Sequence, residues 1–252
     1  MRSIPPFIRF LLLSIILSAA VSANTLEYNF EKGNEYYANG EFKQAIGEYE
    51  KILQADYQSA EVYYNLGNAY FRQGMLGHAI KNYIRARRLA PRDDDIIANL
   101  DFARQFAIDK IEVTEETIFF QYVNKFFDWF SLSEVTWLSG ILLVLVIAGM
   151  FIGSLYRWVR IPTPLLVTIA ACFIITAIFA GVKLDRDVLT RTGVVISEQT
   201  EVRNGPGEDY NNQFTAHAGL VFKIEREESE YYLVNFENRL KGWIARAAVD
   251  EI

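Results

Sequence analysis

Two apolar runs, VTWLSGILLVLVIAGMFIGSLY (residues 135–156) and IPTPLLVTIAACFIITAIFAGV (residues 161–182), decide the fold of this chain. Neither run contains a charged side chain, and about 20 helical residues, each rising ~1.5 Å, cross a hydrocarbon core of about 30 Å. Because lipid offers the backbone no hydrogen-bonding partner, both runs are expected to be helical. The connection, residues 157–160, is too short to hold a domain. The runs therefore predict a transmembrane hairpin whose flanking regions share one side of the membrane.

Two independent sequence features indicate the orientation of the hairpin in the membrane. The connection contains Arg157 and Arg160 and no acidic residue, and short loops rich in Arg or Lys stay cytoplasmic. Independently, residues 1–23 combine two arginines, an apolar stretch and small residues at the cleavage position, which is typical of a secretory signal peptide. An uncleaved first anchor is the alternative. Both signals place the regions that flank the hairpin outside the cytoplasm.

The composition limits what the chain can bind. Its 252 residues, 51% of them hydrophobic, leave room for two small modules beside the hairpin. The single cysteine, Cys172, lies inside the second run, so no internal disulfide forms, and with only His78 and His217 a Cys/His zinc cluster is excluded. A formal charge of -6 gives nucleic acid nothing to bind. We therefore expect protein partners, and no metal, cofactor or nucleic acid.

Residues 26–93 repeat themselves with an offset of 34 residues. The residue types that return are Glu27 and Glu61, Gly33 and Gly67, Asn34 and Asn68, Tyr36 and Tyr70, Gly40 and Gly74, Ala45 and Ala79, Ile46 and Ile80, and Tyr49 and Tyr83. The second copy resembles the tetratricopeptide repeat, with Leu66-Gly67 on one helix, Ala79 and Tyr83 on the next, and Pro91 after it. The resemblance implies an all-α solenoid of two helix pairs, residues 26–59 and 60–93.

Two such units bury little apolar surface without a cap. Asp93-Asp94-Asp95 suits the positive end of a helix dipole. An apolar stripe then follows at helical spacing, formed by Ile96, Ile97, Leu100, Ala103, Phe106 and Ala107. The pattern predicts a capping helix over residues 95–109, so that the repeat domain spans residues 24–110.

The tetratricopeptide family presents a concave groove built from the first helix of each pair. By that resemblance, seven residues face a bound peptide or protein: Phe30, Asn34, Tyr37, Tyr64, Asn65, Asn68 and Phe71. Asparagine amides there would hold the main chain of a peptide. Replacing Asn65 and Asn68 is then expected to weaken binding and to leave folding nearly intact. The alternative is that these residues only pack or solvate the superhelix.

Residues 111–134 turn from acidic to aromatic. The acidic part is a linker, and the aromatic residues from Phe119 to Phe130 predict a juxtamembrane helix at the membrane surface, with packing against the repeats as the alternative. Ser131 and Glu134 resemble a capping box that opens the first span. Inside the spans, Gly149 and Gly153, like Ala177 and Gly181, have the spacing of small residues that lets helices pack closely, and packing within the hairpin explains it.

After a second linker, residues 183–192, the chain reads as short β-strands broken by turns. Strands are expected at residues 194–196, 202–203, 220–225, 231–236 and 243–245. The segment VRNGPGEDY (residues 202–210), with Gly219 and the later Gly242-Trp243-Ile244, resembles the bacterial SH3-like domain, which implies an all-β barrel over residues 193–252. Tyr210 and Trp243 then line a shallow aromatic binding groove or, alternatively, fill the barrel core. Eleven acidic residues against six basic ones disfavour an anionic polymer as ligand.

The order of these parts makes the chain a multi-domain membrane protein that resembles the BatE-type proteins of bacterial aerotolerance (Bat) operons. The stretch IANLDFAR (residues 97–104) strengthens the resemblance. It implies a non-enzymatic scaffold on the periplasmic face of the bacterial inner membrane. It also implies membrane-protein partners with von Willebrand factor A domains, and contact with membrane lipid.

Two other function classes compete with the scaffold. One is a protein that tethers the cell wall, with peptidoglycan bound by the SH3-like domain. The other is an enzyme such as a cell-wall hydrolase. The enzyme lacks a catalytic set, because His78 falls in a repeat turn, His217 in a barrel loop and Cys172 in lipid.

The predicted topology is testable with reporter fusions. A reporter that is active only outside the cytoplasm should work after Asp109 or after Ile252 and fail when inserted near Arg160. The outer fusions must agree, because two spans return the chain to its starting side. Opposite activities at the two outer positions would contradict the hairpin.

Overall fold

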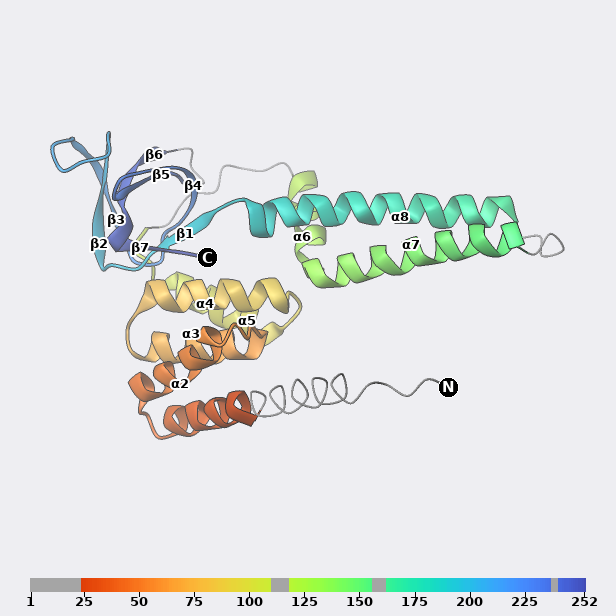
Figure 1. Cartoon of the computed structure of the whole chain (residues 1–252). Helices are drawn as coiled ribbons and strands as arrows, with labels where there is room; N and C mark the ends of the chain where they lie inside the picture. Colours follow the sequence, from red (N-terminus) through yellow and green to blue (C-terminus); the bar gives the residue numbers. More distant parts are fainter. Residues whose placement is uncertain (1–23, 110–117, 156–161, 237–239) are drawn as a thin grey trace, which may run out of the picture.

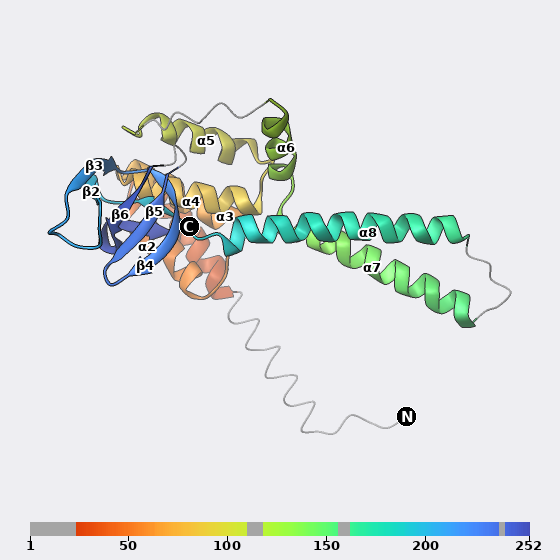
Figure 2. The same cartoon turned by 90° about the horizontal axis from the view of Figure 1, so that it is seen from above.

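The computed structural model describes residues 24–109, 118–155, 162–236 and 240–252. The predicted signal peptide, part of the acidic linker and the predicted cytoplasmic loop lie outside these residues. The described chain forms a helical repeat region, a two-helix hairpin and an antiparallel sheet (Figure 1). The sheet lies beside α4 of the repeats, and the hairpin projects away from both, as the two views agree (Figures 1 and 2).

The repeat region consists of antiparallel helices. Residues 24–38 are helical, and they are followed by α2 (Phe42–Gln54), α3 (Ala60–Arg72), α4 (Leu76–Leu89) and α5 (Asp94–Gln105). Gly40 and Gly74 separate the helices of each pair with φ of 79° and 75°, which glycine adopts without strain. Ser59 caps α3 and Asp93 caps α5, each accepting a backbone N–H at 3.1 Å. Helix α5 ends earlier than the predicted capping helix, and Phe106 beyond it is exposed.

Both helix pairs are packed by the same contact. A Cβ added to Gly33 would come within 2.6 Å of the Tyr49 ring, and one added to Gly67 within 2.8 Å of the Tyr83 ring. Both tyrosine rings are buried, and Ala79 is fully buried at the same helix crossing. The small residues that recur at the 34-residue offset therefore serve the close approach predicted for them.

Helices α7 (Leu132–Leu155) and α8 (Thr163–Leu184) are each long and apolar enough to cross a membrane. The predicted capping box opens α7, since the N–H of Glu134 donates to Ser131 Oγ at 3.2 Å and the N–H of Ser131 donates to Glu134 Oε2 at 2.9 Å. A π-helix, η1 (Asp185–Leu189), continues α8. A Cβ added to Gly153 or Gly181 would meet no described atom within 4 Å outside its own helix, so hairpin packing does not explain those two glycines.

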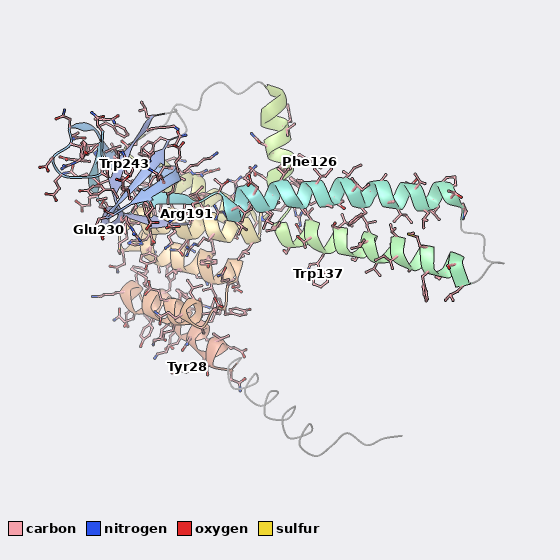
Figure 3. All side chains as sticks on the ribbon, turned by 45° about the horizontal axis from the view of Figure 1, so that its top comes forward. Tyr28, Phe126, Trp137, Arg191, Glu230 and Trp243 are labelled. Carbon is pink, nitrogen blue, oxygen red and sulfur yellow. The ribbon has the colours of Figure 1, made fainter. Side chains whose placement is uncertain are left out.

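Helix α6 (Ile118–Asp128) lies across the base of the hairpin (Figure 1). The Phe127 ring contacts Phe179 of α8 at a centroid distance of 4.4 Å. Tyr122 of α6 is exposed, and Phe126, which also stacks on Phe179, remains largely exposed. Trp137 near the start of α7 is exposed as well (Figure 3). Exposed aromatic rings at the ends of apolar helices are typical of the level of lipid headgroups.

The C-terminal region is a seven-stranded antiparallel sheet. Its strands are β1 (Thr192–Val195), β2 (Gln199–Arg203), β3 (Asn212–His217), β4 (Val221–Glu228), β5 (Tyr231–Asn235), β6 (Lys241–Ala245) and β7 (Val249–Glu251). Their order is β3-β2-β6-β5-β4-β1-β7, and register shifts in β2 and β4 bend the sheet around a core of Val202, Phe222 and Ile244. The strand prediction missed β3 and β7, the two edges.

The sheet docks on α4 and shares its core. Val194 of β1 is fully buried within the same apolar cluster as Ile80 and Tyr83 of α4. The β1 backbone crosses so close to α4 that a Cβ added to Gly77 would come within 2.2 Å of the Val195 carbonyl oxygen. The repeats and the sheet are therefore one packed body on this side.

Cationic side chains of α4 hold β7 along the same interface. Lys81 pairs with Asp250, and Arg85 donates to the main-chain oxygen of Glu251 at 2.9 Å. Burial lowers the pKa of Lys81, and the hydrogen bond that Lys81 donates to Asp250 opposes that shift. The interface thus combines apolar burial with charge-assisted hydrogen bonds.

Replacing Gly67 with Ala should destabilise the chain, because the new methyl group meets the buried Tyr83 ring at 2.8 Å. Overpacking of this kind costs about 1 to 3 kcal/mol. Gly47→Ala in α2 is the matched control, since its Cβ would meet nothing within 4 Å and Ala raises helix propensity. Equilibrium denaturation of the purified chain checks both, and equal stabilities of the two variants would contradict the packing described.

Candidate peptide-binding face

The seven residues predicted to line a groove all lie on the first helix and α3. Each is half-buried, so each contributes both to the helix packing and to the surface: Phe30, Asn34, Tyr37, Tyr64, Asn65, Asn68 and Phe71. Their contacts follow the repeat, since Phe30 packs on Tyr49 at 6.0 Å between ring centroids and Tyr64 packs on Tyr83 at 6.2 Å. Tyr37 meets Phe42 edge-on at 5.2 Å.

A row of asparagines links three helices. Asn34 Oδ1 accepts hydrogen bonds from the Tyr49 hydroxyl at 2.6 Å and from Asn65 Nδ2 at 3.0 Å. One repeat later, Asn68 Oδ1 accepts from the Tyr83 hydroxyl at 2.7 Å and from Asn99 Nδ2 at 3.0 Å. The equivalent bonds show that the 34-residue period is repeated in the side-chain network and extends into α5. We call Asn34, Asn65, Asn68 and Asn99 the asparagine row.

The asparagine row keeps hydrogen-bonding capacity for a ligand. The oxygens of Asn34 and Asn68 each accept two bonds, which fills their lone pairs. Among the residues that the structure describes, no hydrogen bond is made by the Nδ2 groups of Asn34 and Asn68. The same holds for the Oδ1 atoms of Asn65 and Asn99. The row therefore offers both donors and acceptors, which is what the main chain of an extended peptide requires.

An aromatic cluster lies beside the asparagine row. The ring of Phe71 lies 5.7 Å from Phe102 and 5.4 Å from Phe106, and the last two are 49% and 56% exposed. Such an exposed apolar group suits the side chain of a bound protein segment. The sequence interpretation left out Asn99 and Phe102, although Asn99 repeats Asn65 at the 34-residue offset and so could have been found.

The tyrosine hydroxyls in this network remain protonated donors. Burial raises the pKa of Tyr49 and of Tyr83 above the ordinary value of 10, and neighbouring ionisable groups add to the shift. Both hydroxyls point to an asparagine oxygen, so each asparagine holds a buried polar group. Removing Asn68 would leave the Tyr83 hydroxyl without its acceptor. The expectation that Asn68 can be replaced without affecting folding therefore does not fit its hydrogen bonds.

The two aromatic residues predicted in the sheet region lie in different environments. Trp243 of β6 is 6% exposed, and the Arg226 guanidinium lies 5.0 Å from the centre of its ring (Figure 3). Tyr210 is 51% exposed and covers Gly205. The buried Trp243 agrees with the alternative prediction that it fills the core of the sheet region. The exposed Tyr210 does not agree with that alternative.

The histidines and the cysteine lie far apart along the fold. His78 is in the first turn of α4 and stacks on Tyr70, and Cys172 is in α8. His217 ends strand β3 rather than lying in a loop, and its Nδ1 lies 3.0 Å from Asp109 Oδ1. Each residue contacts its own neighbours, and no contact joins two of the three among the described residues.

Comparison with known families identifies the repeats. A family model described as TPR repeat matches residues 33–74, and one described as tetratricopeptide repeat matches residues 60–93. No curated protein matches the chain. The matched residues cover α2, α3 and α4, so the N-terminal region is a tetratricopeptide-repeat region, a fold that serves protein–protein interaction and is not catalytic.

The bond between Asn68 and Tyr83 is testable by a double-mutant cycle. Asn68→Ala should lower the free energy of unfolding by about 1 to 3 kcal/mol, because the buried Tyr83 hydroxyl loses its acceptor. In a Tyr83→Phe background the same change should cost less, since that hydroxyl is absent. Equilibrium denaturation measures the four proteins, with the exposed Asn39→Ala as control. Strict additivity would show that the two side chains are not coupled.

Proposed function

We propose that the chain is a membrane-anchored scaffold that binds an extended segment of a partner protein on the face formed by the asparagine row and the aromatic cluster. The observation that carries the proposal is the repeated hydrogen-bond network, which fixes the asparagine side chains and leaves a donor or an acceptor on each. The repeats are an interaction fold. No chemical step is required of any side chain.

The docking of the sheet supports the same face. The sheet covers α4, the outer helix of the second repeat, by contacts at Gly77, Lys81 and Arg85. Phe102 and Phe106 of the inner face are about half exposed. A partner would therefore approach the side of the first helices, where the sheet does not compete with it.

The location and the partner follow from the sequence. The arginine-containing connection and the N-terminal leader favour an inner-membrane protein with the repeats and the sheet on the periplasmic face. The resemblance to BatE-type proteins favours a Bat-type stress or aerotolerance complex, and partners with von Willebrand factor A domains. The C-terminal sheet would be the SH3-like domain of that family.

Tethering to peptidoglycan through the sheet is the second candidate. It is favoured by Tyr210, an exposed aromatic ring on a turn of the sheet. The surplus of acidic residues in residues 193–252 opposes it, because the cell wall is an anionic polymer.

The experiment compares partner capture by matched variants of the full chain in native membranes. The double variant Asn65→Ala with Phe106→Ser removes one amide and one aromatic ring from the proposed face. A lost hydrogen bond and a lost apolar contact together cost about 2 kcal/mol or more, which weakens capture of a co-expressed von Willebrand factor A domain protein at least about 30-fold.

The matched control is Asn39→Ala with Tyr28→Ser, which removes the same groups from exposed positions outside the proposed face. It should capture the partner normally. Tyr210→Ser tests the sheet, with purified peptidoglycan as its ligand. Equal capture by the face variant and the control would contradict the proposed function, and loss of peptidoglycan binding on Tyr210→Ser alone would support tethering instead.

A further inference from the structure

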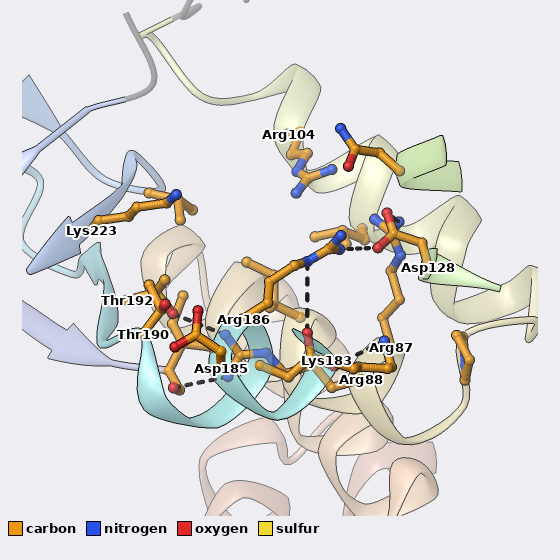
Figure 4. A pocket seen from close by; sticks show the side chains of 17 residues that line it. Arg87, Arg88, Arg104, Asp128, Lys183, Asp185, Arg186, Thr190, Thr192 and Lys223 are labelled. Atoms are coloured by element: carbon orange, nitrogen blue, oxygen red, sulfur yellow. Dashed lines mark hydrogen bonds and ion pairs between the residues drawn. The ribbon is translucent and has the colours of Figure 1, made fainter. Parts of the chain in front are cut away.

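A polar cavity of about 580 Å³ lies where the repeats, the sheet and the hairpin meet (Figure 4). Its walls come from α4 and α5, from the end of α6, from η1 after the second apolar helix, and from β1 and β4. The repeats, the hairpin and the sheet each contribute residues to it. The cavity is of a size that holds a small ligand or a headgroup.

The cavity is basic although the chain is acidic. Its lining includes six cationic side chains, Arg87, Arg88, Arg104, Lys183, Arg186 and Lys223, against three carboxylates, Asp128, Asp185 and Asp187. The whole chain carries a formal charge of -6. An excess of positive charge at one cavity of an acidic protein concentrates anions there.

The carboxylates neutralise one side of the cavity. Asp128 accepts from Arg186 and, at 3.3 Å, from Arg87. Asp187 pairs with Lys183 at 2.9 Å, and both side chains are nearly buried. These pairs fix the walls.

Arg88 and Lys223 carry the remaining positive charge. Arg88 is half-buried and donates to the main-chain oxygen of Ile252 at 3.0 Å and to Thr192 Oγ1 at 2.9 Å. Within the described residues, Arg88 forms no ion pair with an Asp or Glu side chain, and burial lowers its pKa. Lys223 is exposed, and its side chain makes no hydrogen bond or ion pair with the residues that the structure describes. Figure 4 shows Lys223 at the left, Arg104 at the top, and the Arg186 side chain extending between them toward Asp128.

The cavity lies at the level where the apolar hairpin ends. Lys183, in the last turn of α8, lines the cavity and donates to the main-chain oxygen of Phe127 at 3.3 Å. The Phe127 side chain in turn packs on Phe179, one turn deeper in α8. Tyr122 and Trp129, near Phe127 in the chain, are exposed aromatic residues, which are favoured at the level of lipid headgroups. A ligand in the cavity is therefore within reach of the surface of a membrane that the hairpin spans.

We propose that this cavity binds the phosphate group of an anionic membrane lipid, with Arg88, Lys223 and Arg104 as its cationic lining. The charge excess selects an anion, and guanidinium groups match phosphate oxygens in geometry. The position at the end of α8 selects a lipid headgroup over a free phosphate ion. This proposal rests on the membrane anchoring in the proposed function, and it is independent of the peptide-binding face.

The test measures lipid binding to the full chain purified in a zwitterionic detergent. Native mass spectrometry gives the affinities for short-chain phosphatidylglycerol, for short-chain phosphatidylcholine and for inorganic phosphate. Phosphatidylglycerol should bind most tightly. Lys223→Gln should weaken it about fivefold, the effect of one cation near a membrane surface, and added salt should weaken it further.

Lys43→Gln is the matched control, because Lys43 is also exposed, on α2, and its side chain likewise makes no hydrogen bond or ion pair within the described chain. It should bind phosphatidylglycerol as the original chain does. Equal affinities for the two lipids, or no difference between Lys223→Gln and Lys43→Gln, would overturn the site. Inorganic phosphate that binds as tightly as the anionic lipid would overturn the lipid assignment.

Membrane retention after an alkaline wash separates this proposal from the anchoring on which it rests. The original chain and Lys223→Gln should both stay in the membrane, because the hairpin and not the cavity anchors the chain. Release of the original chain would contradict the anchoring itself. Retention without any preference for the anionic lipid would contradict the cavity site alone.

Discussion

Helix α4 is the element on which the rest of the structure depends, because it is covered on several sides at once. It packs on α3 through the Tyr83 ring and Gly67, and on the sheet through Gly77 and the β1 backbone. A glycine is required at residue 77, since a Cβ there would clash with the Val195 carbonyl oxygen at 2.2 Å. One helix thereby joins the repeat core to the sheet core, and the two cannot be separated without exposing apolar surface.

This arrangement divides the repeat region into a structural side and a free side. On the structural side, the cations of α4 bond to the main-chain oxygens of Glu251 and Ile252 and to Asp250. On the other side, the asparagine row is tied by tyrosine hydroxyls, so that its side chains are ordered before any ligand arrives. A site whose side chains are already fixed loses less entropy on binding. Packing and preorganisation are consequences of the same small residues, since the buried tyrosines that hold Asn34 and Asn68 lie against Gly33 and Gly67.

Acidic and basic side chains are concentrated in different parts of the structure. Acidic residues dominate the sheet, and the cations collect where α4, α5, α8 and β4 approach the base of the hairpin. Several of these cations are half-buried, which is costly unless each has a partner. Asp128 and Asp187 pair with three of them, Arg87, Arg186 and Lys183. Arg88 instead donates to the Thr192 hydroxyl and to the main-chain oxygen of Ile252. The base of the hairpin is thus one place where the structure tolerates buried charge.

The sequence by itself determined the local elements. The 34-residue period predicted the helix pairs, and the length of the uncharged apolar runs predicted the two long helices. Ser131 and Glu134 predicted the capping box at the start of α7. Each of these signals depends only on residues that are near one another in the chain. The edge strands β3 and β7 escaped prediction, since edge strands need no apolar alternation; β3 reads NQFTAH. Only the tertiary structure decided that Trp243 is buried, that Asn68 holds Tyr83, and that Arg88 of α4 meets Thr192 and Ile252. The partners of Arg88 lie 104 and 164 residues away in the chain, and contacts at such separations depend on how the finished units pack.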